Sequence, residues 1–161
     1  MIGDWETFFV AQAGAVAALA GLVFVALSIN LREILPHPAL TGRAGEAIIL
    51  MVQPVVAAFL VLIPNQGMRA LGIELLLLGS ASFLFVNTLI WHAFDASRER
   101  SMRDFSIRVV GAELAVLPTI IAGALLIDHS ITGLNWQAAG ALVCLCVAIL
   151  DAWVLLVEIL R

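Results

Sequence analysis

The chain has 161 residues, of which 63% are hydrophobic and only 12% are charged, and its mean hydropathy is +1.09. A soluble globular domain is nearer half apolar and a quarter charged, so this composition excludes that class and is typical of an integral membrane protein. The net charge of −4 is small, and the arginines are spread over several loops, which argues against nucleic acid as a partner.

Five apolar segments follow one another along the chain. Each is long enough to cross roughly 30 Å of hydrocarbon as a helix, and a helix satisfies its own backbone hydrogen bonds in lipid. The predicted spans are approximately residues 8–30, 44–63, 70–93, 107–127 and 136–159. They account for the length of the chain, so we expect an all-α, polytopic helical bundle that forms a single transmembrane domain, residues 1–161. The second span, which contains Glu46, Gln53 and Pro54, is the one most open to a re-entrant interpretation.

The flank of the first span is acidic, with Asp4 and Glu6 where a cleaved signal peptide would be basic. The apolar run that follows is also too long for a cleaved segment, so we expect a retained span. With five spans, Arg69 alone falls on one side of the membrane. The other basic residues fall on the opposite side: Arg32, Arg43, Arg98, Arg100, Arg103, Arg108 and Arg161. Because cytoplasmic loops carry the excess of basic residues, the N-terminus is predicted to lie outside and the C-terminus in the cytoplasm.

All eight basic residues are arginine, and alanine and glycine are abundant. This usage favours a GC-rich bacterial genome. We therefore expect a multi-pass protein of a bacterial plasma (inner) membrane.

Small residues cluster on one face of the first span. Gly14, Ala18 and Gly21 share this face, and Gly140 offers a similar contact point in the fifth span. Such faces let helices approach closely in lipid. Two interpretations remain open for the first span: a central packing helix within the monomer, or a subunit interface or pore-lining helix of a homo-oligomer.

Asp151 is the strongest functional candidate. It lies well inside the fifth span, on a stripe shared with Gly140, Cys144 and Glu158. An ionisable side chain at that depth costs a few kcal/mol or more unless it is paired, hydrated or protonated. Asp151 is therefore either a cation or proton site or a hydrogen-bonded residue that clamps two helices.

Further polar residues are predicted at a similar depth toward the cytoplasmic side: Glu113, Asn87, His92 and Asn30. Together with Asp151 they would line a water-filled inner vestibule, with Glu113 and Asp151 as charged sites and His92 as an access relay. The alternatives are structural. Arg108 would be the counter-charge of Glu113, and His92 would hydrogen-bond to Asp95.

Gln53 is expected near mid-membrane, directly before Pro54, whose ring removes a backbone hydrogen bond. It either satisfies that break, hydrogen-bonds to another helix, or coordinates a permeating ion together with exposed carbonyl groups. Pro118 in the fourth span presents the same alternatives.

The sequence contains no nucleophile–base arrangement, no phosphate-binding glycine loop and no set of histidines or cysteines with metal-ligand spacing. Cys144 and Cys146 lie on different sides of a helix, which suits apolar filler better than a disulfide or a metal pair. We therefore expect no enzymatic activity, no cofactor and no metal site.

The opening segment carries a resemblance. The run Trp5–Phe9, the triplet Ala13–Ala15 and the run Gly21–Asn30 resemble the start of a group of small uncharacterised bacterial membrane proteins. The similarity covers about the first 30 residues. It implies a bacterial plasma-membrane location and carries over no functional residues, because the group has no established activity.

Two functions remain open from the sequence. The first is a small homo-oligomeric channel or transporter for a cation or proton that uses intramembrane carboxylates, with Asp151 and Glu113 as charged sites and Asn87 and Gln53 along the path. The second is a non-enzymatic accessory or scaffold protein that packs against another membrane complex. In both, the lipid bilayer is the surrounding partner.

Overall fold

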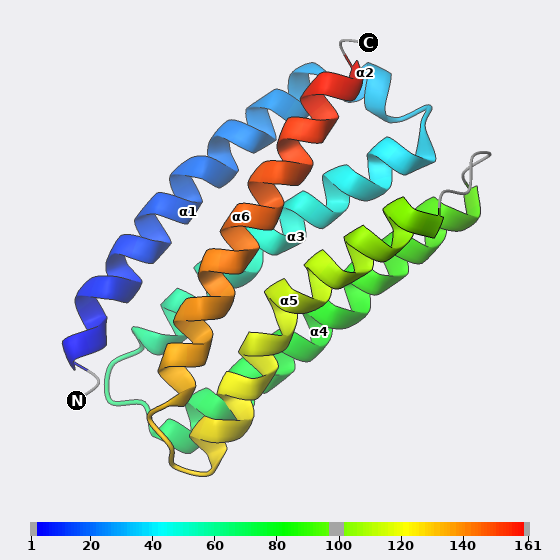
Figure 1. Ribbon diagram of the computed structural model, residues 1–161. Coiled ribbons are helices and arrows are strands. Elements are labelled where there is room, and N and C mark those ends of the chain that lie inside the picture. The colour runs from blue at the N-terminus through cyan, green and yellow to red at the C-terminus, as the bar shows by residue number, and fades with distance from the viewer. Residues whose placement is uncertain (1–2, 97–101, 160–161) are drawn as a thin grey trace.

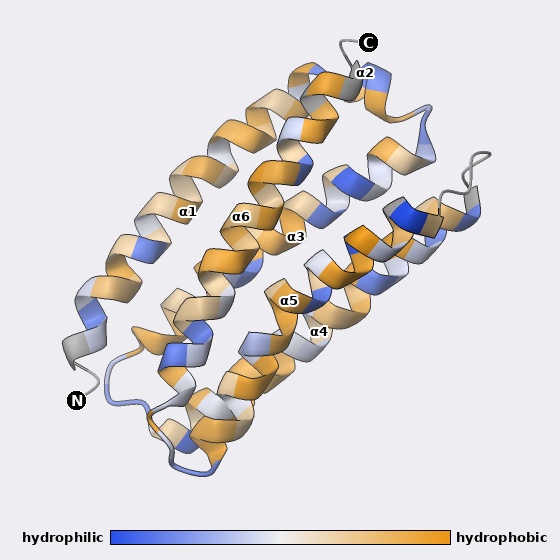
Figure 2. Cartoon of the chain, in the orientation of Figure 1, coloured by the Kyte–Doolittle hydropathy of each residue, from blue (hydrophilic) through white to orange (hydrophobic). Residues whose placement is uncertain are grey.

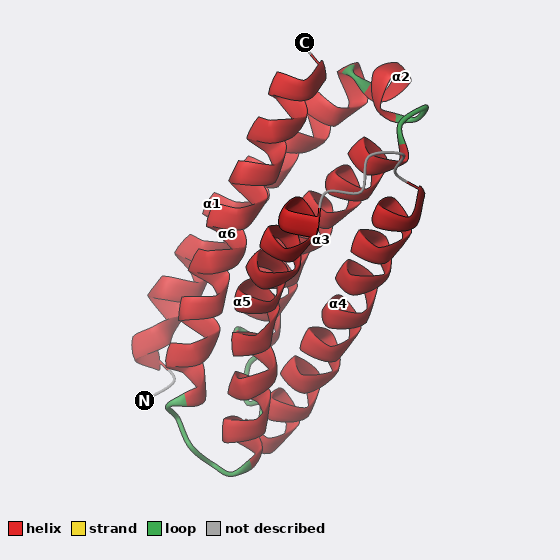
Figure 3. Cartoon of the chain, turned by 45° about the vertical axis from the view of Figure 1, so that its right-hand side comes forward, coloured by secondary structure: helices red, strands yellow, loops and turns green. Residues whose placement is uncertain are grey.

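The computed structural model describes residues 3–96 and 102–159 as helices joined by short loops (Figures 1 and 3). The helices are α1 (Gly3–Ile29), α2 (Leu31–Ile34), α3 (Pro38–Val61), α4 (Met68–Ala96), α5 (Met102–Ile127) and α6 (Gly133–Ile159). Five of the helices in these ranges are long and apolar enough to cross a membrane, which confirms the predicted all-α bundle of five spans. Arg98, Arg100 and Arg161 lie outside the described residues. The side chains of Asp4, Ala96, Asp104, Leu156, Glu158 and Ile159 are also not described.

Helices α3, α4, α5 and α6 form an antiparallel four-helix bundle in which each packs against the next and α6 closes against α3. Short loops between antiparallel neighbours produce this arrangement. The diagonal partners α3 and α5 touch only weakly through their backbones. Helix α1 lies outside this bundle, packed mainly on α3 with slight contact to α6 (Figure 1).

The turn between the first two spans is built around the sequence Pro36-His37-Pro38. Helix α3 begins at Pro38, earlier than the predicted start near Ala44, because proline at the first helical position is preorganised for a helix and lacks the N–H that would be unpaired there. Short helix α2 is anchored by Ile34, which is buried, and the Thr41 hydroxyl donates to its carbonyl oxygen (3.1 Å). The earlier start places Arg43 inside the second span.

A close backbone contact joins α4 to α5 through two glycines. A Cβ atom added to Gly123 would lie 2.6 Å from the backbone nitrogen of Leu76 and 2.7 Å from the carbonyl oxygen of Gly72. A Cβ at Gly72 would meet the carbonyl oxygen of Gly123 at 2.8 Å. Since lipid provides no hydrophobic drive between helices, such backbone contact is what holds them together.

The position of α1 tests whether its small residues pack within the monomer. A Cβ added at Gly14 or Gly21 would meet no atom within 4 Å, and Ala18 is exposed. The interpretation of α1 as a central packing helix is therefore wrong, because its small-residue face points away from the bundle. The opposite face carries the packing, with Phe9, Val16 and Val23 buried.

Candidate functional site

Four charged side chains from three helices meet in the half of the bundle that carries α2. The guanidinium of Arg108 on α5 donates from Nε (3.1 Å) and from its terminal nitrogen (2.7 Å) to Oε2 of Glu46 on α3. Arg43, one turn before Glu46, faces Asp151 on α6, with 3.9 Å between the guanidinium nitrogen and Oδ1. We call these four residues the inner charge cluster. Figure 2 shows the hydrophilic segments of α3 and α5 facing each other in this half of the bundle.

Helical spacing explains why the cluster forms. Residues three or four apart share a helix face, so Arg43 and Glu46 point into the same space. Glu46 lies across the bundle diagonal from Arg108, and the side chains bridge the gap that the backbones of α3 and α5 leave open. With both arginines and both acids ionised, the cluster is neutral, which is how buried charge is tolerated.

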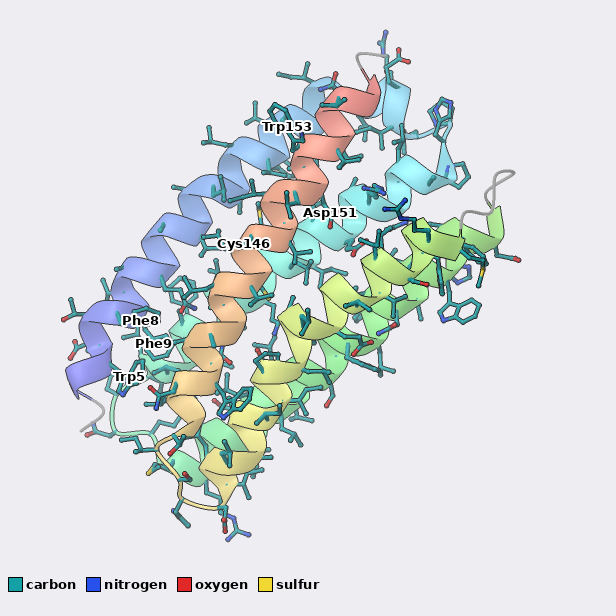
Figure 4. All side chains as sticks on the ribbon, viewed as in Figure 1. Trp5, Phe8, Phe9, Cys146, Asp151 and Trp153 are labelled. Atoms are coloured by element: carbon teal, nitrogen blue, oxygen red, sulfur yellow. The ribbon has the colours of Figure 1, made fainter. Side chains whose placement is uncertain are left out.

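The two ion pairs of the cluster differ in quality. Glu46 is only 1% exposed and its pair with Arg108 has full hydrogen-bond geometry. Asp151 is 7% exposed, and its distance to Arg43 exceeds hydrogen-bonding range. Its second oxygen, Oδ2, is buried and has no hydrogen-bond partner in the part of the chain that the structure describes. Figure 4 shows Asp151 extending from α6 toward α3 and α5, while Trp153 lies on the exposed outer side. Asp151 is therefore the member of the cluster whose bonding is incomplete.

A cavity of about 310 Å³ adjoins the cluster. All four charged residues line it, and its apolar walls come from α5 and α6: Ile107, Gly111, Val147, Leu150 and Val154. This volume is large enough for several water molecules or for a small polar ligand. Asp151 thus has both an unused oxygen and adjacent space.

The structure corrects the predicted role of Arg108. Arg108 pairs with Glu46, so the expectation that it is the counter-charge of Glu113 is wrong. Glu113 instead accepts a hydrogen bond from Nδ2 of Asn87 (3.1 Å), and this bond ties α4 to α5. The same Asn87 nitrogen also bonds to the carbonyl oxygen of Phe83 (2.9 Å). The two arginines of this half of the bundle therefore lie beside Glu46 and Asp151, and the side chain that bonds to Glu113 is an amide.

The structure does not gather the predicted vestibule residues into one place. Asn87, Glu113 and His92 are not among the residues that line the cavity at Asp151. His92 is exposed on α4, and the amide of Asn30 bonds to the carbonyl oxygen of Ala26 within α1 (2.9 Å). Residues at a similar depth in different spans need not face one another, because each helix has its own rotation about its axis and so directs its polar side chains differently.

A second polar layer lies at mid-membrane. Nε2 of Gln53 donates to the Thr119 hydroxyl across the bundle diagonal (2.7 Å), which is the inter-helix alternative for Gln53. The Cys144 thiol lies 3.3 Å from the carbonyl oxygen of Ala115 and 3.7 Å from Oε1 of Gln53. Both cysteines are free, with Cys144 buried and Cys146 exposed. Gln53 therefore links three helices, one level further from α2 than the inner charge cluster.

The contacts next to this layer place the remaining predicted residues. Gly140 on α6 packs against Pro118 of α5, where an added Cβ would lie 2.9 Å from the proline side chain. Gly140 therefore serves packing within the bundle. Gln12 of α1 donates to the carbonyl oxygen of Pro54 (2.8 Å), so α1 is pinned to α3 by a hydrogen bond beside the proline break.

Gln137, near the start of α6, completes the series of buried polar groups. It is fully buried, and neither its amide oxygen nor its amide nitrogen has a hydrogen-bond partner among the described residues. Leaving both atoms unpaired costs several kcal/mol in lipid, about 1–3 kcal/mol for each group. A buried water molecule is the usual way in which such an amide is satisfied.

Sequence reasoning missed three members of the inner charge cluster: Arg43, Glu46 and Arg108. A signal was present, since Glu46 and Gln53 share a stripe in the second span and Arg108 lies within the fourth. The sequence alone did not reveal that α3 and α5 are diagonal partners, and this pairing is what brings the residues together.

Among the described residues, no group of three or more histidine, cysteine, aspartate or glutamate side chains is placed to hold a metal ion. Comparisons of the chain with models of protein families, with curated proteins and with solved structures gave no match. The functional argument therefore rests on the geometry of the chain itself.

Proposed function

We propose that this integral membrane protein is a small transporter that moves protons, with Asp151 as the proton-binding site. One observation carries the proposal: Asp151 is buried, its Oδ2 has no hydrogen-bond partner among the described residues, and the residue lines a cavity in the half of the bundle that carries α2. An ionisable residue at such depth is by default a functional group with a partner.

The charges around Asp151 favour a proton over a metal cation. Arg43 and Glu46 of α3 and Arg108 of α5 are the charged groups that face it from the neighbouring helices. A metal ion in the cavity would lie beside two guanidinium groups as well as two carboxylates, so the cluster offers it no net negative charge. A proton adds no separate charge, because it converts the carboxylate to a neutral acid, while Arg43 stabilises the carboxylate after the proton leaves.

The remaining buried polar groups mark a route toward the other membrane face. Gln53 and Thr119 form the next layer, and Gln137 lies beyond them with two unused hydrogen-bonding atoms. Apolar side chains, among them Leu50 and Ile90, fill the bundle between these layers. This packing favours a transporter that changes conformation over a permanently open pore.

The environment follows from the arginine distribution. We place the α2 end of the bundle in the cytoplasm of a bacterium and the α5–α6 loop outside, because basic residues collect at the α2 end. Asp151 would then exchange protons with the cytoplasm.

The test is proton flux into proteoliposomes, followed with an internal pH dye under a pH gradient and a membrane potential. We expect flux in the wild type, its loss in Asp151→Asn, and partial recovery in Asp151→Glu, which restores the carboxylate. Glu74→Gln, at the far end of α4, is the control for loss of one acid. Flux that persists unchanged in a folded Asp151→Asn protein would refute the assignment.

A second candidate function is an accessory or scaffold role, favoured by the exposed small-residue face of α1. Gly14, Ala18 and Gly21 have open space in front of them. An exposed face of small residues like this one can receive another helix. The occupant would be a second copy of this chain or another membrane protein. Absence of flux under every gradient, together with stoichiometric co-purification of one partner that is lost in Gly14→Leu, would favour this role.

A further inference from the structure

The cavity beside Asp151 is open on the side of the lipid. A Cβ added at Gly111 of α5 would lie 3.8 Å from a Val147 methyl group of α6, which is ordinary van der Waals contact, so the two helices leave room for one methyl group at this level. Ile107 and Leu150, which line the same cavity, are 59% and 63% exposed. A ligand in this cavity can therefore extend an apolar chain outward between α5 and α6.

The polar side of the cavity offers one cation and one acceptor. Arg108 and Glu46 are already joined by two hydrogen bonds through Oε2 and neutralise each other's charge. The less completely bonded cation and acid in this cavity are therefore Arg43 and Asp151. Arg43 makes no hydrogen bond to another side chain among the described residues, and Oδ2 of Asp151 accepts none. A lone anion on Arg43 would be repelled by Asp151, and a lone cation on Asp151 would be repelled by Arg43. A ligand that carries both charges satisfies both groups.

We infer that this cavity binds an amphiphilic zwitterion, whose anion pairs with Arg43, whose N–H-bearing ammonium donates to Asp151, and whose apolar chain leaves between α5 and α6. Two sources provide this chemistry: the headgroup of a phospholipid that carries a primary ammonium, and a free amino acid with an apolar side chain. The inference names the substrate class of the site proposed above, and rests on that proposal only for transport. Binding itself requires no proton movement.

The experiment is equilibrium binding to the purified full chain in maltoside micelles, with no gradient present. The first probe is dihexanoyl phosphatidylethanolamine. Two corresponding lipids are compared with it: phosphatidylcholine, whose ammonium has no N–H, and phosphatidylglycerol, which has no ammonium. Leucine is the probe for a free zwitterion. Native mass spectrometry gives the number of ligands bound and the Kd. We expect phosphatidylethanolamine to bind about tenfold or more tightly than the other two lipids, because a charge-assisted hydrogen bond is worth at least that factor.

Three variants test the geometry. Asp151→Asn should abolish the preference for phosphatidylethanolamine over phosphatidylglycerol, and Arg43→Gln should weaken binding of phosphatidylethanolamine about tenfold. Gly111→Leu keeps every charge but fills the space between α5 and α6. We expect this variant to abolish binding of phosphatidylethanolamine. Ala139→Leu, exposed elsewhere on α6, is its control. Melting curves in the same micelles show that each variant is folded.

The outcomes separate the two sources and the two proposals. Leucine binding that Asp151→Asn abolishes, without phosphatidylethanolamine binding, would assign the site to a free zwitterion. Equal affinity for the three lipids without leucine binding, or binding unchanged in both Asp151→Asn and Gly111→Leu, would overturn the inference. Selective binding without proton flux would refute the proposed function and support the inference about the ligand. Proton flux without selective binding would support the proposed function and refute the inference.

Discussion

The hydrogen-bonded pair of Glu46 and Arg108 is the strongest single cross-link between diagonal helices, and its removal gives a quantitative test of the fold. Glu46 is 1% exposed, and the Arg108 side chain is 12% exposed. Removing one partner of a buried pair costs about 3–5 kcal/mol, because the other charge is left uncompensated. Arg108→Gln strands the more deeply buried charge, so we expect it to lower the free energy of unfolding by the full ~3–5 kcal/mol.

Glu46→Gln should cost less, about 1.5–3 kcal/mol, which is the value of hydrogen bonds to a charged group. The remaining Arg108 is nearer the surface, and Asp151 in the same cavity partly compensates its charge. In the double variant the cluster is neutral again and two amides face each other. We therefore expect the double variant to be less destabilised than Arg108→Gln alone.

The measurement is unfolding by sodium dodecyl sulfate in mixed micelles, monitored by circular dichroism, for the wild type, both single variants and the double variant. A matched pair of controls is Glu33→Gln and Arg32→Gln, both exposed on α2. Exposed pairs contribute about 0–1 kcal/mol, so these controls should show little change. Additive effects of Glu46→Gln and Arg108→Gln would refute the reasoning, because independent residues do not share a buried pair.

Three further predictions follow from other parts of the chain. Gly123→Ala should lower the free energy of unfolding by about 1–3 kcal/mol, because its Cβ would overlap the backbone of α4. Gly14→Ala, where an added Cβ meets no atom, should leave that free energy unchanged. The same unfolding assay measures both variants. An impermeant maleimide applied to intact cells should label Asp128→Cys in the α5–α6 loop but not His37→Cys at the α2 end, and the reverse pattern would invert the orientation. Asp151→Asn should leave the protein as stable as the wild type or make it more stable, since it removes a buried charge whose own pair is long; a large loss in the unfolding assay would show that Asp151 is a structural clamp.

The transmembrane spans could be predicted because the hydropathy of a segment is the sum of contributions from its own residues. Apolar length decides whether a helix crosses the membrane, and no knowledge of neighbouring helices is needed. The first turn of the second span was missed, since Pro38 reads as a break in a hydropathy profile but is a favourable first residue of a helix. That one detail moved Arg43 from a loop into the wall of the cavity.

The site was less predictable because it depends on which helices face each other. That Asp151 is a buried ionisable residue could be predicted from its depth in the span alone. Its neighbours could not be predicted in this way, since the vestibule expectation grouped Glu113 and Asn87 with it by depth, and the structure pairs those two on the α4–α5 contact instead. Helix rotation and the diagonal relation of α3 and α5 come from packing, which in this chain depends on glycine contacts such as that between Gly72 and Gly123.

The two ion pairs of the inner charge cluster, Glu46–Arg108 and Arg43–Asp151, differ in a way that suggests different roles. If the cluster only held α3 against α5, the Glu46–Arg108 pair would suffice, because it is buried and has full hydrogen-bond geometry. Arg43 and Asp151 add a second pair whose separation is too long for a hydrogen bond and which lines the cavity. Within the described residues, this pair leaves Oδ2 of Asp151 without a hydrogen-bond partner. Such an arrangement costs stability in lipid, and a group kept under strain of this kind is the one available to a proton or a ligand. On the function proposed above, the Glu46–Arg108 pair maintains the geometry within which Arg43 and Asp151 would bind a proton or a ligand.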